Sequence, residues 1–332
     1  MRIVIDAMGG DHAPECNVDG AWSAAMEWKD TQIVLVGDQA KIEPLLKAKG
    51  TAVPDNLTVH HASEVIDGDD EPVKAVRRKK DASMVVAGRM LKEKQADAMI
   101  SSGNTGALMT TGLLVVGRME GIERPALAPM IPTLDGVGVL ALDLGANMDA
   151  KPEHLAQYAL MGSLYREKVM GISKPRVGLL NVGTEPGKGN ELTKLTFPLI
   201  EQLPIHFVGN VEARDIMDGT CDVLVCDGFA GNILLKSIEG TAGAMFKILK
   251  EQFSQSLKSK IGAALLLPQL KGIKEKMDYS EHGGAPLLGL SSLVIKGHGS
   301  SDANAVKNAV RQTRIALQSH LVENISKEIS GK

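Results

Sequence analysis

The stretch RIVIDAMGGD, residues 2–11, decides the fold class that we expect for this chain. Its first half, Arg2–Asp6, is a short β-branched run of the kind that forms a buried strand. Its second half is a small polar loop that contains two glycines. A helical pattern follows at Glu15–Trp28. The stretch therefore predicts a strand, a loop and a helix in the order that is typical of parallel α/β proteins.

The same order recurs along the 332 residues of the chain. Further strands are expected at Gln32–Val36, Ala98–Ser101, Val137–Asp143, Val177–Leu180, Ile205–Val208, Val223–Cys226 and Leu293–Lys296, and further helices at Ala82–Lys94, Pro152–Val169 and Ala303–Val322. Two apolar runs within Leu127–Asp143 are separated by turn residues, which predicts a hairpin and hence a mixed sheet. The sequence thus predicts a three-layer α/β/α fold with a mostly parallel mixed sheet.

The domain organisation follows from the absence of an obvious linker in the sequence. We expect one catalytic α/β unit over residues 1–332, with two lobes around a cleft as the alternative. Residues 240–280 are expected to form a protruding helical and hydrophobic segment within it.

Composition excludes several classes of protein. Hydrophobic residues make up 44% of the chain, enough for a substantial core. The aromatic content of 3% and the net charge of −3 argue against a nucleic-acid partner. The chain starts directly with a predicted strand, and its three cysteines do not suit a disulfide framework. A cytoplasmic location is therefore expected.

Glycine-rich polar loops follow most of the predicted strands. They are Asp6–Asp11, Ser101–Gly106, Asp143–Asn147, Asn181–Asn190, Gly209–Asn210, Asp227–Asn232 and Gly297–Ser301. In open parallel sheets, ligands bind beyond the carboxyl ends of the strands. Glycines there let backbone N–H groups approach an anion. The loops together predict a shared polar site for an anionic ligand.

Two familiar motifs match the sequence only in part, and a third is absent. Gly136–Ala141 has the letters of a dinucleotide fingerprint but opens a strand instead of a helix. Gly183–Gly189 resembles a phosphate-binding P-loop, but it is one residue short and lacks the magnesium-binding Ser or Thr. No Gly-x-Ser-x-Gly elbow occurs, and Cys226 is expected to be a core residue. We therefore expect no cofactor, no metal and no nucleophile supplied by the protein, so that the bound anion itself attacks.

The loop sequences carry a resemblance that covers nearly the whole chain. The motifs DAMGGD (6–11), SGNTGA (102–107), DLGAN (143–147), NVGTEP (181–186), DGFAGN (227–232) and KGHGS (296–300) are similar to those of the bacterial phosphate acyltransferases of phospholipid synthesis. The resemblance implies that acyl–acyl carrier protein and inorganic phosphate give acyl phosphate and free carrier. It also implies a fold like those of phosphate acetyltransferase and isopropylmalate dehydrogenase, a homodimer, and a downstream membrane acyltransferase that uses glycerol 3-phosphate.

Candidate site residues come from these loops. Phosphate is predicted to lie against Gly103, Asn104, Thr105 and Gly106, with helix capping by Asn104 or Thr105 as the alternative. The catalytic candidates are Lys188 as a mobile cation, Asn147, Asn181 and Asn232 as donors to the thioester oxygen, and His282 and His298 as phosphate ligands or proton donors. Each could instead be a surface or turn residue that bonds its own backbone.

An apolar run at 261–268 predicts contact with an anionic membrane surface through Ile261, Leu265, Leu266 and Leu267. Lysines flank the run on both sides, and Pro268 is expected to turn the chain at its tip. Burial in a homodimer interface is the alternative. The enzyme is thus expected at the inner face of the cell membrane, bound peripherally. The carrier protein, which is acidic, is expected to dock on the basic run Arg77–Lys80.

Other functions remain open at the level of sequence. The same loops would serve a phosphate acyltransferase that uses a short-chain acyl-CoA. A non-catalytic acyl-binding scaffold at the membrane would also present the apolar run. A dehydrogenase would need metal-binding aspartates and arginines for a dicarboxylate, which the sequence does not mark.

Overall fold

The computed structural model describes residues 1–276 and 283–330, which divide into two compact units. Among the described residues, unit 1 comprises 1–129, 160–174 and 283–330. Unit 2 comprises 130–159 and 175–276. Each unit contains its own sheet, so the predicted sheet is present as two sheets.

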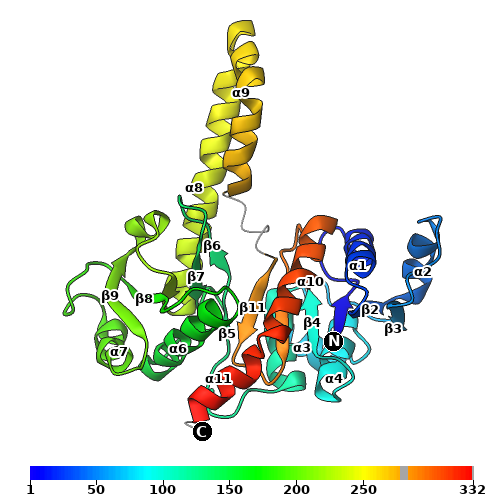
Figure 1. Cartoon of the computed structure of the whole chain (residues 1–332), viewed down its shortest axis with the longest axis horizontal. Helices are drawn as coiled ribbons and strands as arrows, with labels where there is room; N and C mark the ends of the chain where they lie inside the picture. The colour runs from blue at the N-terminus through cyan, green and yellow to red at the C-terminus, as the bar shows by residue number, and fades with distance from the viewer. Residues whose placement is uncertain (277–282, 331–332) are drawn as a thin grey trace. The chain divides into compact units, whose positions relative to one another are not determined.

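The sheet of unit 1 is mostly parallel (Figure 1). Its strands in spatial order are β3 (Leu57–His61), β2 (Gln32–Gly37), β1 (Arg2–Asp6), β4 (Ala98–Ser101), β12 (Leu293–Lys296), β11 (Ala285–Leu288) and β5 (Ala126–Leu127). The first five are parallel, while β11 is antiparallel to both of its neighbours. Strand β12 comes from the end of the chain, yet it lies beside β4, so the loops after β1, β4 and β12 share one edge of the sheet.

Helices cover this sheet (Figure 1). They are α1 (Glu15–Glu27), α2 (Gln39–Lys47), α3 (Pro72–Arg78), α4 (Ser83–Lys92), α5 (Thr105–Thr111) with its π-helical continuation η1 (Gly112–Val116), α10 (Ala303–Gln318) and α11 (Leu321–Ser330). Helices α1 and α10 pack on each other closely, because Gly20 leaves room for Val306. Helix α4 is buried along most of its length, as expected for a helix that covers the centre of a sheet.

Unit 2 holds a five-stranded sheet in the order β6 (Met130–Ile131), β7 (Val139–Leu142), β10 (Val223–Val225), β8 (Arg176–Asn181) and β9 (His206–Glu212). Strands β6 and β7 form the predicted hairpin, with Met130 opposite Leu140. The remaining pairs are parallel. The other elements of this part of the chain are α6 (Pro152–Lys168), α7 (Glu191–Glu201), the 3₁₀ helix η2 (Ala213–Asp218), α8 (Gly228–Ser254) and α9 (Leu257–Lys276).

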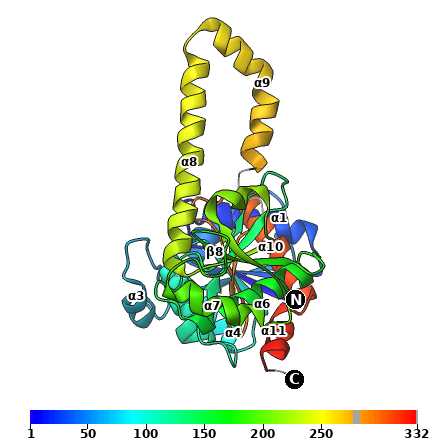
Figure 2. The same cartoon turned by 90° about the vertical axis from the view of Figure 1, so that its left-hand side faces the viewer.

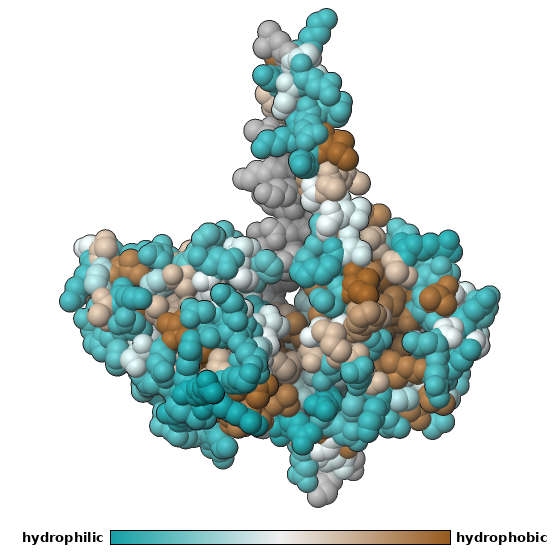
Figure 3. All heavy atoms as spheres, turned by 180° about the vertical axis from the view of Figure 1, so that it is seen from behind, coloured by the Kyte–Doolittle hydropathy of each residue, from teal (hydrophilic) through white to brown (hydrophobic). Residues whose placement is uncertain are grey.

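Helices α8 and α9 form a long hairpin that extends beyond the sheet of unit 2 (Figure 2). Its turn lies at Gln255 and Ser256, so the expected turn at Pro268 is wrong: α9 continues through that residue. Figure 3 shows apolar side chains set among polar ones on the visible face of the hairpin. Within residues 1–276 and 283–330, no helix has the length and apolar character needed to cross a membrane.

The predicted strands are all present, whereas the helices show where local patterns mislead. Helices α2 and α7 were not expected, because Pro44 and Pro198 lie inside them and interrupt the helical pattern. The single helix expected at Ala303–Val322 is wrong. His320 adopts a left-handed backbone conformation, with φ of 50°, and divides the segment into α10 and α11.

Candidate active site

The three loops of unit 1 at the ends of β1, β4 and β12 are joined through their backbones. The N–H of Asp11 donates to the carbonyl of Gly299 at 2.8 Å, and the N–H of Gly297 donates to the carbonyl of Ser101 at 2.9 Å. Gly9 lies so close to the second loop that a Cβ there would come within 2.7 Å of the Gly103 nitrogen. Glycine at this position therefore lets the two loops touch.

Two ionisable groups lie beneath these loops. The carboxylate of Asp6 is buried and accepts from the hydroxyls of Ser83 and Ser101, each at 2.6 Å. Burial raises the pKa of Asp6, and these hydrogen bonds oppose the rise. The ammonium of Lys296 donates to the carbonyls of Ser102, at 3.3 Å, and of Gly297. Burial lowers the pKa of Lys296 to about 8, against the opposing charges of Asp6 and Asp11.

The predicted phosphate loop, Gly103–Gly106, enters α5. Asn104 caps this helix: its Oδ1 accepts from the N–H of Ala107 at 3.0 Å, and its Nδ2 donates to the carbonyl of Gly68 at 2.8 Å. Both the Oδ1 and the Nδ2 of Asn104 are therefore hydrogen-bonded within the protein. Thr105 and Gly106 are exposed at the start of the helix. A phosphate here would meet backbone N–H groups and the Thr105 hydroxyl instead of the Asn104 amide.

In unit 2, Asp143 organises the loop after β7. Its carboxylate is fully buried and accepts from the N–H groups of Ala146 and Asn147, at 3.1 and 2.6 Å. The Nδ2 of Asn147 donates to Asp143 and, at 3.0 Å, to the hydroxyl of Tyr158. The amide of Asn147 is therefore part of a network within the protein. Asn232, in the first turn of α8, lies against Gly145 of the same loop.

The loop after β8 carries Lys188. Asn181 closes its base: Nδ2 donates to the carbonyl of Lys188 at 3.1 Å, and Oδ1 accepts from the N–H of Val182 at 2.8 Å. The ammonium of Lys188 is exposed and lies 3.9 Å from the carboxylate of Glu185. Asn210, which was expected in a loop after a strand, lies inside β9 and donates to the carbonyl of Glu185 at 2.8 Å. The Oδ1 atom of Asn210 is buried without a donor among the described residues.

Cys226 is a core residue, as predicted. It belongs to the apolar cluster beneath the sheet of unit 2, and its Sγ donates to the carbonyl of Asp143 at 3.3 Å. Burial, with the nearby charges of Asp143 and Asp227, raises the pKa of this thiol well above its usual value. A thiol that stays protonated is a poor nucleophile.

The structure describes only one of the two predicted histidines. His298 is exposed in the loop after β12, where its Nδ1 lies 2.8 Å from the Ser300 hydroxyl and accepts from the Ser300 N–H. His282 lies outside the described residues. The predicted site residues thus fall in both units: Gly103–Gly106 and His298 in unit 1, and Asn147, Asn181, Lys188 and Asn232 in unit 2.

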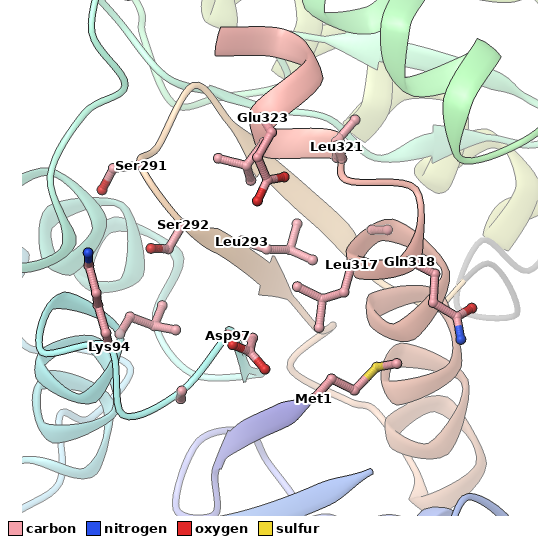
Figure 4. A pocket seen from close by; sticks show the side chains of 14 residues that line it. Met1, Lys94, Asp97, Ser291, Ser292, Leu293, Leu317, Gln318, Leu321 and Glu323 are labelled. Atoms are coloured by element: carbon pink, nitrogen blue, oxygen red, sulfur yellow. The ribbon is translucent and has the colours of Figure 1, made fainter. Parts of the chain in front are cut away.

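A cavity of about 430 Å³ lies elsewhere in unit 1 (Figure 4). It is lined by residues that precede strands, such as Met1, Asp97 and Ser292, and by Leu317 and Leu321 at the junction of α10 and α11. These residues mark the amino ends of the parallel strands, the edge opposite to the glycine-rich loops. The cavity is therefore separate from the candidate active site.

Comparison with known proteins identifies the class and the family. A family model described as "Fatty acid synthesis protein" matches residues 1–324. A phosphate acyltransferase of Halalkalibacterium halodurans is 56% identical over 99% of this chain and 97% of its own length. One of Brevibacillus brevis is 58% identical over the same shares. The chain is therefore an α/β enzyme of the acyltransferase class. It belongs to the phosphate acyltransferase family, which confirms the resemblance drawn from its loops.

Solved structures show the same fold. A phosphotransacetylase of Streptococcus pyogenes aligns with a TM-score of 0.61 at 19% identity, covering 97% of this chain and 94% of that one. The EutD phosphotransacetylase of Staphylococcus aureus aligns with a TM-score of 0.58 at 15% identity, covering 96% and 94%. The expected α/β fold of the phosphotransacetylase type is thus confirmed.

Proposed function

We propose that this enzyme transfers a fatty acyl group from acyl carrier protein to inorganic phosphate, for phospholipid synthesis. One observation carries the proposal: Cys226, the cysteine that directly follows β10, is a buried thiol whose pKa burial raises well above its usual value, so that it stays protonated. The family transfers acyl groups with phosphate, so the nucleophile is phosphate itself. A phosphate oxygen attacks the thioester carbon, the C–S bond breaks, and the carrier leaves as a thiolate that takes up a proton. The products are acyl phosphate and free carrier.

The energetics of this route require little from the protein. Alignment of two bound reactants supplies about 7–11 kcal/mol. A single donor to the developing oxyanion supplies about 2.7–4 kcal/mol. The leaving thiol has an ordinary pKa of about 8.5, so it needs little help from an acid near neutral pH.

The structure refines the proposed roles of the residues. Phosphate binds in the loop Gly103–Gly106 at the start of α5, where Thr105 and Gly106 are exposed, whereas the Gly103 N–H already donates to the Ser101 hydroxyl at 3.1 Å. Within unit 2, Lys188 and Asn232 are the candidate donors to the thioester oxygen: the Lys188 side chain is exposed, and Asn232 lies near the start of α8 against Gly145. Asn147 and Asn181 shape their loops, since their amides already donate within the protein.

The partners follow from the surface. The carrier docks on the exposed Arg77, Arg78 and Lys80, whereas Lys79 is held 2.6 Å from Asp70. The side chains of Ile261, Leu265 and Leu266 are 56, 75 and 48% exposed on α9, which supports contact with an anionic membrane surface. There the acyl phosphate would pass to a membrane acyltransferase that uses glycerol 3-phosphate. A homodimer that covers the same side chains is the alternative use of the hairpin.

The decisive experiment mixes the purified protein with palmitoyl–carrier protein and phosphate and traps acyl phosphate with hydroxylamine. We expect hydroxamate to form only when phosphate is present. A parallel reaction with acetyl-CoA tests the short-chain alternative. Binding of the acyl carrier without phosphate-dependent hydroxamate from either donor would overturn the proposal in favour of a non-catalytic scaffold.

A further inference from the structure

A partly buried lysine, Lys296, joins two of the glycine-rich loops of unit 1. Lys296 ends β12, and its ammonium donates to the carbonyl of Ser102 in the loop after β4 and to that of Gly297 in its own loop. The third loop joins through the hydrogen bond from Asp11 to Gly299. The ammonium therefore contacts two of the loops directly, and the third is joined to them by a backbone hydrogen bond.

The charges around Lys296 are few. The acidic groups that act on it are Asp6, from β1, and Asp11, from the loop that follows. Asp6 is bound by the hydroxyls of Ser83 and Ser101, so it does not serve Lys296 as a close ion-pair partner. An ammonium in such surroundings is costly, because its desolvation is only partly offset. A neutral side chain would serve better if packing were the only need.

We infer that Lys296 is a positioning residue that holds the loops 101–106 and 297–301 in the conformation that binds phosphate. The inference rests on the proposed function. In a trans peptide the carbonyl and the next N–H point in opposite directions. The contact with the Gly297 carbonyl therefore fixes the orientation of the whole peptide between Gly297 and His298. The contact with the Ser102 carbonyl likewise fixes the peptide that leads into the Gly103–Gly106 turn, and the ammonium adds a positive charge beneath the anion.

Protonation of Lys296 gives the role a characteristic pH dependence. Its pKa is about 8, so the ammonium is present below this pH and is lost as the pH rises through it. Phosphate binding should weaken over the same range. The free energy of unfolding should instead increase with pH over this range. Between about pH 8 and 10.5 the lysine is protonated in the unfolded chain but largely neutral in the folded protein, so unfolding takes up a proton and becomes less favourable as the pH rises.

The test compares the parent with Lys296→Met, Lys296→Arg and the control Lys92→Met, which changes an exposed lysine of α4. For each protein the KM for phosphate and kcat are measured from pH 6.5 to 9.5, together with the thermal midpoint. We expect Lys296→Met to raise the phosphate KM about tenfold or more at neutral pH, as for the loss of a charge-assisted hydrogen bond, with a much smaller change in kcat. Its midpoint should stay near that of the parent.

The outcomes separate the two proposals. The parent should show a phosphate KM that rises through about pH 8, and Lys296→Arg, which stays charged, should flatten that rise. Titration of phosphate itself is common to both proteins and cancels in the comparison. A parent KM that does not change with pH, or a Lys296→Met protein with unchanged phosphate KM, overturns the role of Lys296. A parent that forms no acyl phosphate at any pH overturns the proposed function instead.

Discussion

Asn181 and Lys188 are joined by a hydrogen bond of 3.1 Å from the Asn181 amide to the Lys188 carbonyl. The residue that ends β8 thus also closes the base of the loop that carries the exposed ammonium. A short hydrogen-bonded loop that carries an exposed ammonium can present it to a ligand with little loss of conformational entropy on binding.

Replacing Asn181 by Ala should loosen this loop. Two hydrogen bonds are lost, each worth about 0.5–1.5 kcal/mol, so we expect kcat/KM for acyl phosphate formation to fall about tenfold. Asn324→Ala is the control, because it removes a side-chain hydrogen bond from α11 to the carbonyl of Ser319, which caps α10. Steady-state kinetics of both variants provide the measurement. Equal losses in the two would show that Asn181 matters only for stability.

Asn104 is expected to act through the helix that it caps. Asn104→Ala should lower the free energy of unfolding by about 1 kcal/mol and raise the phosphate KM. Asn104→Ser keeps an oxygen that accepts from the Ala107 N–H, so it should recover most of both losses. Urea unfolding and phosphate saturation curves measure the two effects. If Ser recovered stability but not phosphate binding, the Asn104 amide would itself contact phosphate.

Cys226→Ala should retain most activity, because the thiol is a protonated core group and phosphate is the nucleophile. The substitution removes the hydrogen bond to the Asp143 carbonyl, so we expect a loss of about 1 kcal/mol in stability. Mass spectrometry of the parent, quenched during turnover, should find no acyl group on this residue. An acyl–Cys226 adduct would instead establish a two-step route through the enzyme.

Leu265→Glu should release the protein from anionic vesicles. Leu265 is the most exposed of the large apolar side chains described on α9, at 75%, and a carboxylate there would be repelled by an anionic surface. Leu195→Glu is the control, since Leu195 is 53% exposed on α7. Vesicle sedimentation and the oligomeric state are measured together. Conversion to monomers with unchanged vesicle binding would favour a dimer interface on the hairpin.

Sequence patterns predicted the strands well and the site only in part. The strand runs are short and apolar, and the loops after them were found because glycines and polar residues cluster there. The roles of Asn104, Asn147 and Asn181 could not be assigned from the sequence, because an amide that hydrogen-bonds within the protein and one that binds a ligand have the same sequence. The loop expected at Gly209–Asn210 is wrong, because strand β9 continues through both residues to Glu212.

The sequence by itself determined the alternation of strands, loops and helices, because these depend on side-chain periodicity and turn residues over short distances. It also determined the family, through loop motifs in a constant order. Only the tertiary structure decided that β12 lies beside β4, which brings Lys296 to Ser102 across 194 positions of the chain. The altered pKa of Lys296 follows from that placement, since desolvation and nearby charge depend on residues that are distant in sequence.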